Sequence, residues 1–152
     1  MEKKQKIHQL NTYKRTNNEI RGDNIGRKER EWYPGAIYHL MERGIRRLEI
    51  FKEEMDYEIF LIILKKVTEE YEAKVHAYCL MTNHVHLLIE TSNYKIGKIM
   101  QKIAGDYAKT YNQKYGYRGH LFEDRYVDDA YVESERSLDE IIDLIRNADE
   151  WI

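Results

Sequence analysis

Two histidines separated by a single valine lie in the apolar stretch YCLMTNHVHLLIE, residues 78–90. Side chains two positions apart on a strand point to the same side of a sheet, with Cα atoms roughly 7 Å apart. His84 and His86 are therefore expected side by side, close enough for both imidazoles to bind one divalent ion. The alternative is that they are two half-exposed polar positions of an ordinary strand, and spacing alone does not decide between the two.

Other polar residues near the pair have less specific patterns. Glu90 shares the predicted face and is either a partner of the histidines or solvated. His39, on a separate predicted strand, is a looser candidate for the same site. His76 and His8 fit ordinary surface or core roles.

The elements that must position the pair can be inferred from hydrophobic periodicity. Alternation around residues 37–41, 74–81 and 84–90 predicts strands, and a weaker strand is expected at 125–132. Apolar positions three and four apart predict amphipathic helices at 55–73, 94–116 and 135–151.

The resulting order, β-α-β-β-α-β with an appended C-terminal helix, is that of an α+β, ferredoxin-like fold with an antiparallel sheet. In this topology the first and third strands are central and both main helices cover one face. His84 and His86 would then lie in mid-sheet on the opposite, open face. A polar, basic N-terminal arm (residues 1–33) would precede a single domain (residues 34–152).

Charge is distributed unevenly along the 152 residues, whose net charge is −2. Residues 1–33 hold nine Lys/Arg against five Asp/Glu, and residues 92–126 hold seven against three, whereas residues 127–152 hold two against nine. The two basic segments suit contacts with phosphates, and the acidic end does not. With one cysteine and no apolar run of bilayer length, we expect a cytoplasmic protein without a disulfide framework or a membrane partner.

Three stretches taken in order carry a family resemblance: WYPGAIYHLMERGIRRLEIF, YCLMTNHVHLLIE and KIMQKIAGDYAKTYNQKYGYRGHLFEDRY, together spanning about residues 32–126. They resemble the IS200-like and REP-associated tyrosine transposases, the one-tyrosine branch of the HUH single-strand nucleases. The resemblance implies that His84 and His86 bind a divalent metal, Mg or Mn, beside a scissile phosphate of single-stranded or hairpin DNA. It also implies a tyrosine on the C-terminal helix that forms a phosphotyrosine intermediate.

The last helix departs from the pattern of the family. When its apolar positions are aligned with those of the family, Asn147 matches the family's asparagine and is a weak candidate for a metal ligand. Asp143 then occupies the position of the family's tyrosine. No tyrosine follows Tyr131, which is the reserve nucleophile, while Tyr107 and Tyr111 lie on the apolar face of their helix and fit the core. Two functions stay open: a transposase that cleaves and transfers strands, and a catalytically decayed relative that binds structured DNA without cleaving it.

The resemblance also places two basic segments near the DNA strand. The predicted DNA contacts are Arg43, Arg46, Arg47, Arg118, His120 and Arg125, with solvated loop charges as the alternative reading. The sequence allows either a monomer or a homodimer.

Overall fold

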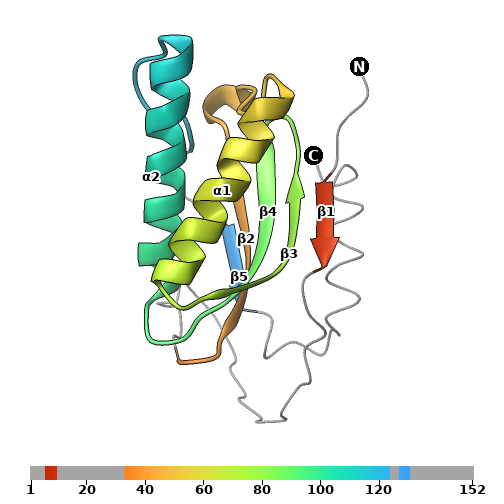
Figure 1. Ribbon diagram of the computed structural model, residues 1–152, viewed down its shortest axis with the longest axis vertical. Coiled ribbons are helices and arrows are strands. Elements are labelled where there is room, and N and C mark those ends of the chain that lie inside the picture. The colour runs from red at the N-terminus through yellow and green to blue at the C-terminus, as the bar shows by residue number, and fades with distance from the viewer. Residues whose placement is uncertain (1–5, 10–32, 124–126, 131–152) are drawn as a thin grey trace, which may run out of the picture.

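The computed structural model describes residues 6–9, 33–123 and 127–130 of the chain. Within these ranges the polypeptide forms five strands, two α-helices and one short 3-10 turn (Figure 1). In chain order they are β1 (Lys6–Gln9), β2 (Ile37–Arg43), η1 (Ile45–Arg47), α1 (Glu54–Glu70), β3 (Lys74–Leu80), β4 (His84–Glu90), α2 (Ile96–Tyr115) and β5 (Val127–Ala130).

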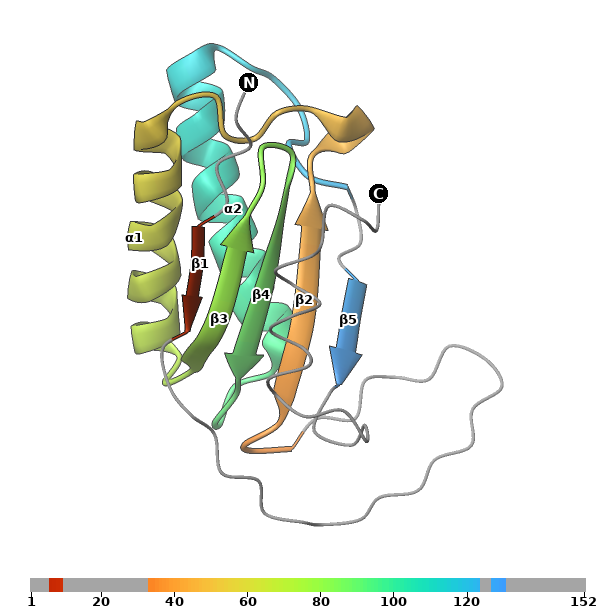
Figure 2. The same cartoon turned by 90° about the vertical axis from the view of Figure 1, so that its right-hand side faces the viewer.

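The strands form one antiparallel sheet in the order β1-β3-β4-β2-β5 (Figure 2). The predicted first and third strands, β2 and β4, are central neighbours, and α1 and α2 both pack on one face of the sheet (Figure 1). This is the ferredoxin-like arrangement that the order of sequence patterns predicted. The predicted C-terminal helix lies outside the described residues.

The hydrophobic core fills the space between the sheet and the two helices. Alternate strand residues, such as Leu40 on β2 and Leu87 on β4, are completely buried against Phe60 of α1 and Ile99 of α2. Because successive side chains of a strand alternate, the residues between them face the other side of the sheet. None of the helices in the described ranges is long and apolar enough to cross a bilayer.

Strand β1 is a feature that the sequence patterns did not predict. Its four residues pair with the edge strand β3, with Ile7 opposite Cys79 and His8 opposite Tyr78. The segment has no hydrophobic periodicity of its own, so its extended conformation follows from the free hydrogen-bonding edge that β3 offers. Part of the expected N-terminal arm is therefore an element of the sheet.

The two helices are joined by a buried carboxylate at the start of α1. Asp56 accepts hydrogen bonds from Lys114 Nζ at 2.7 Å and from the Tyr115 hydroxyl at 2.5 Å, both at the end of α2. It also accepts the backbone N–H groups of Lys52 and Glu53. Although burial acts to raise it, these hydrogen bonds lower the pKa of Asp56 below its ordinary value.

Candidate metal and nucleic-acid site

His84 and His86 project from β4 on the face that the helices leave uncovered, as their spacing predicted. Val85 and Leu87, which alternate with them, belong to the core beneath the helices. The expectation that the histidines face open solvent is wrong, because their exposed fractions are only 1% and 3%. The three imidazoles lie close together: the His84 and His86 ring centroids are 5.1 Å apart, and the His39 ring stacks on His86 with centroids 5.2 Å apart.

The side chain of Asn83, in the turn between β3 and β4, fixes the tautomer of His84. Asn83 Oδ1 lies 2.7 Å from His84 Nδ1. An amide oxygen only accepts hydrogen bonds, so His84 Nδ1 carries the proton and donates it. In the neutral ring Nε2 then holds its lone pair, which is the form that binds a metal ion.

His86 is a neutral imidazole with one nitrogen engaged by a neighbouring strand. Its Nδ1 lies 3.0 Å from Nε2 of His39 on β2. Burial, followed by the repulsion that His39, His84 and Arg43 would exert on a positive ring, lowers the pKa of His86 to about 3. Its Nε2 is buried and has no hydrogen-bond partner within the described residues, an arrangement that is costly unless a ligand satisfies the atom.

The separation of the two rings fits a shared ion. With metal–nitrogen bonds of about 2.1 Å, two imidazoles on one ion have centroids at most about 6.5 Å apart, and the observed 5.1 Å is within this limit. Across the described ranges, however, no group of three or more His, Cys, Asp or Glu side chains is arranged to hold an ion. The histidine pair can thus supply two ligands, and Asn147, the third predicted ligand, lies outside those ranges.

The other polar residues on this face serve different partners. Glu90 Oε2 lies 3.0 Å from His76 Nε2, so the carboxylate supports His76 rather than the histidine pair. Cys79 is the register partner of His86 on β3, and its buried thiol contacts Met81 Sδ at 3.5 Å.

Three loops meet at the end of the sheet where β4 begins, at the top of Figure 2. Backbone hydrogen bonds join Gly44 N–H to the Asn83 carbonyl at 2.8 Å and Ile45 N–H to the Leu121 carbonyl at 2.8 Å. Arg43, at the end of β2, is the register partner of His84. The structure therefore brings the predicted DNA-contact segments 43–47 and 118–120 together beside the histidine pair.

The exposure of the predicted contacts at this end differs. Arg46, Arg47, Arg118 and His120 are exposed and Arg43 is half-buried. Arg125 lies outside the described residues. We call the segment of residues 43–47, together with residues 118–120, the arginine edge.

None of the ten tyrosines in the described residues lies on the histidine face. Nine belong to the helix-side core or pack against it, and the tenth, Tyr94, contacts Tyr71 and Lys98. Tyr107 and Tyr111 are buried, as predicted, and donate their hydroxyls to the carbonyls of Ile50 and Glu49. Asp143 and the reserve nucleophile Tyr131 lie outside the described residues.

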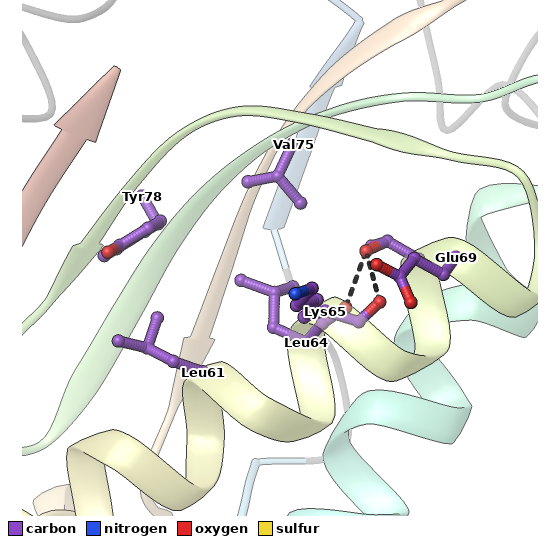
Figure 3. A pocket seen from close by; sticks show the side chains of 7 residues that line it. Leu61, Leu64, Lys65, Glu69, Val75 and Tyr78 are labelled. Carbon is purple, nitrogen blue, oxygen red and sulfur yellow. Dashed lines mark hydrogen bonds between the residues drawn. The ribbon is translucent and has the colours of Figure 1, made fainter. Parts of the chain in front are cut away.

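A separate groove of about 420 Å³ lies on the helix side of the sheet, between α1 and β3 (Figure 3). Its lining is mainly apolar, including Leu61, Leu64, Val75 and Tyr78. Because Val75 and Tyr78 pack against the helix-side core, this groove is on the opposite face from the histidine pair.

Two of the supporting residues had weak sequence signals. Asn83 lies between two predicted strands, a position typical of a turn residue, although its place directly before His84 gives a short side chain access to the ring. His39 was a loose candidate because the sequence does not show which residue of β2 lies closest to His86.

Comparison with known proteins agrees with the fold and with the family resemblance of the sequence. Residues 33–147 match the family described as "Transposase IS200 like". Since the match covers most of the chain, the protein belongs to the IS200-like transposase family, as the resemblance in its sequence indicated. No sequence among curated proteins matches this chain.

Two solved structures share the fold. A candidate transposase from Deinococcus radiodurans R1 is 20% identical, with a TM-score of 0.56, over 80% of this chain and 97% of the other. A REP-associated tyrosine transposase bound to a REP hairpin is 13% identical, with a TM-score of 0.61, over 84% of this chain and 76% of the other. At these identities the likeness establishes the architecture alone.

Proposed function

We propose that this protein binds structured single-stranded DNA at the arginine edge and uses His84 and His86 to hold a divalent ion, Mg or Mn, beside a phosphate of that strand. The observation that carries the proposal is the buried Nε2 of His86, which makes no hydrogen bond within the described residues and lies beside His84. A ligand bonded to this atom would remove the cost of burying it unsatisfied.

The neighbours of the two rings support a role in metal binding. The contact with Asn83 places the ring proton of His84 on Nδ1 and its lone pair on Nε2. If His86 Nδ1 donates to His39 Nε2, the same becomes true of His86. A bound ion would polarise the phosphate and stabilise the charge that develops on its oxygens.

The arginine edge supports the nucleic-acid part of the proposal. Guanidinium groups bind phosphate oxygens with paired hydrogen bonds. Arg43 is the last residue of β2 and lies directly opposite His84 in the sheet. The hairpin-bound relative with the same fold indicates the kind of DNA to test first.

We further propose strand cleavage by a tyrosine. In that step the tyrosine oxygen bonds to phosphorus and the 3′ oxygen leaves with a proton, which gives a 5′-phosphotyrosine and a free 3′ hydroxyl. Since the ten described tyrosines are placed elsewhere, the nucleophile would be Tyr13, Tyr126 or Tyr131. Covalent capture conserves the phosphodiester bond energy for rejoining.

A second candidate function is DNA binding without cleavage. The presence of Asp143 at the position where the family resemblance expects the tyrosine favours it. Both functions require the histidine pair and the arginine edge, and only the first requires a nucleophile.

The deciding experiment incubates the protein and Mn²⁺ with 5′- and 3′-labelled hairpin oligonucleotides carrying single-stranded flanks, followed by denaturing electrophoresis. A covalent protein–DNA band that is lost in His84→Ala and in one of Tyr13→Phe, Tyr126→Phe or Tyr131→Phe would support cleavage. His76→Ala is the matched control, because His76 is a buried histidine of the same sheet that bonds Glu90. The covalent protein–DNA band should persist in the His76→Ala variant.

Hairpin binding in a mobility-shift assay without any covalent band would favour the binding-only function. If neither hairpins nor plain single strands bind at low salt, both functions are wrong.

A further inference from the structure

Two consecutive arginines beside the histidine pair adopt a backbone conformation that is unfavourable for them. Arg46 and Arg47 have φ angles of 52° and 59°, and both lie in the turn between Ile45 and Leu48. Positive φ at both central residues is the pattern of a type I′ turn, in which asparagine and glycine are preferred. In the left-handed conformation the Cβ atom of a residue such as arginine comes too close to the carbonyl oxygen that follows it, and glycine avoids this contact because it has no Cβ.

The surroundings of the turn hold this conformation in place. Arg47 N–H bonds the Gly44 carbonyl at 3.0 Å, and Leu48 N–H bonds the Ile45 carbonyl at 2.9 Å. A Cβ atom on Gly44 would come within 2.2 Å of the Leu48 carbonyl oxygen, so the chain closes tightly here. Glycine at positions 46 and 47 would fit the same backbone without strain.

Burial in the core does not explain arginines at these two positions, because both residues are exposed. Strain that is retained at exposed residues points to a role in binding.

The turn is connected to the histidine pair by a short path. Gly44 donates its N–H to the Asn83 carbonyl, and the side chain of Asn83 bonds His84 Nδ1. On the other side, Ile45 donates to the Leu121 carbonyl and so joins the turn to the segment that carries Arg118 and His120.

We propose that the turn of residues 45–48 is a preorganised phosphate clamp, in which the left-handed backbone of Arg46 and Arg47 is kept because it fixes two guanidinium groups beside the histidine pair. The inference rests on the proposed DNA binding and specifies the part of the site that grips the backbone of the strand. Its ligand is a pair of phosphodiester groups, recognised without regard to base sequence.

The test compares four variants of the full chain by thermal unfolding and by fluorescence anisotropy with a labelled hairpin oligonucleotide at several salt concentrations. The double variant R46G/R47G removes both the strain and the charges, R46A/R47A removes the charges alone, and R46K/R47K keeps both. Glu72→Gly is the matched control, because Glu72 has a φ of 52° just beyond the end of α1 and lies outside the arginine edge.

We expect R46G/R47G to raise Tm by roughly 5 °C and to weaken hairpin binding at least tenfold. Its salt dependence, the slope of log K against log salt, should fall by roughly 1.5 as two phosphate contacts are lost. R46A/R47A should weaken binding as much without raising Tm, and R46K/R47K should keep the salt slope. Glu72→Gly should raise Tm by roughly half as much and leave binding unchanged.

The clamp is wrong if R46G/R47G raises Tm while hairpin affinity and salt slope stay at wild-type values. It is also wrong if that variant gains no stability, because the backbone then carries no strain to explain. Failure of the wild-type protein to bind any hairpin or single strand would instead refute the proposed function, and the clamp with it.

Discussion

The Nε2 atom of His39 lies 3.0 Å from the Nδ1 atom of His86, which links strand β2 to the histidine pair on β4. When an imidazole binds a metal through one ring nitrogen, a hydrogen bond to its other nitrogen holds the ring in the correct tautomer and orientation. His39→Ala should lower the affinity for Mn²⁺ about 10- to 100-fold, as measured by isothermal titration calorimetry. His76→Ala should keep wild-type affinity, and equal losses in both variants would assign His39 a merely structural role.

The contact between Asn83 and His84 allows a paired test of tautomer control. Asn83→Ala removes the oxygen that accepts the Nδ1 proton, so Mn²⁺ affinity should fall about tenfold or more. Asn83→Asp retains an accepting oxygen at the same position and should stay within a few-fold of wild type. If the two variants weaken binding equally, the hydrogen bond does not set the tautomer.

Glu42 makes folding stability depend on pH. Burial, with a smaller contribution from Glu123, raises the pKa of Glu42 from 4.5 to about 7, and its Oε2 has no hydrogen-bond partner within the described residues. The folded state therefore holds this proton more tightly, and stability is lost as pH rises from about 4.5 to 7, by up to about 3 kcal/mol.

Glu42→Gln should remove this loss, so its advantage over wild type in urea unfolding should grow between pH 5 and pH 8. Glu58→Gln, at an exposed position of α1, is the control and should follow the wild-type curve. A constant difference between Glu42→Gln and wild type across this range would contradict the assignment.

Asp56 should stabilise the packing of α1 against α2. Asp56→Asn weakens its bonds with Lys114 and Tyr115 at the end of α2, and we expect a loss of about 2 kcal/mol in the free energy of unfolding. Because the pKa of Asp56 is lowered in the folded state, its contribution is present above the ordinary carboxyl pKa and fades as pH falls. Asp106→Asn breaks an exposed helix pair with Lys102 and should change little. Equal effects of the two substitutions would show that the Asp56 contacts are not stabilising.

Gly44 should tolerate no side chain. The added Cβ of Gly44→Ala would overlap the Leu48 carbonyl oxygen, so the turn of residues 45–48 must open. We expect lower Tm and weaker hairpin binding. Gly105→Ala provides the contrast, since nothing lies within 4 Å of its added Cβ in α2 and helix propensity should stabilise it by about 1 kcal/mol. Wild-type hairpin binding by Gly44→Ala would show that the turn does not position the arginines.

Local periodicity explains why much of this architecture was predictable. The alternation in residues 84–90 specified both a strand and a shared face for His84 and His86, because side-chain direction in a strand depends only on position. Spacings of three and four did the same for Tyr107 and Tyr111 in α2.

Relationships between segments were not predictable in the same way. The closeness of His39 to His86 depends on how β2 and β4 pair, which neither strand encodes by itself. Strand β1 acquires its conformation from its neighbour, so its polar residues carried no signal. The assignments of Asp143, Asn147 and Tyr131 stay predictions.

The hydrogen bonds among the loops at the arginine edge also limit how this chain can vary in length. Besides the bonds of Gly44 and Ile45, the Thr82 carbonyl accepts the N–H groups of both Ile50 and Phe51. A residue inserted into any one of these loops would displace the others, whereas the connection at residues 71–73, at the far end of the sheet, has no such ties to them. Grafting a tag or a new recognition loop onto this protein should therefore succeed at that far connection and fail beside His84.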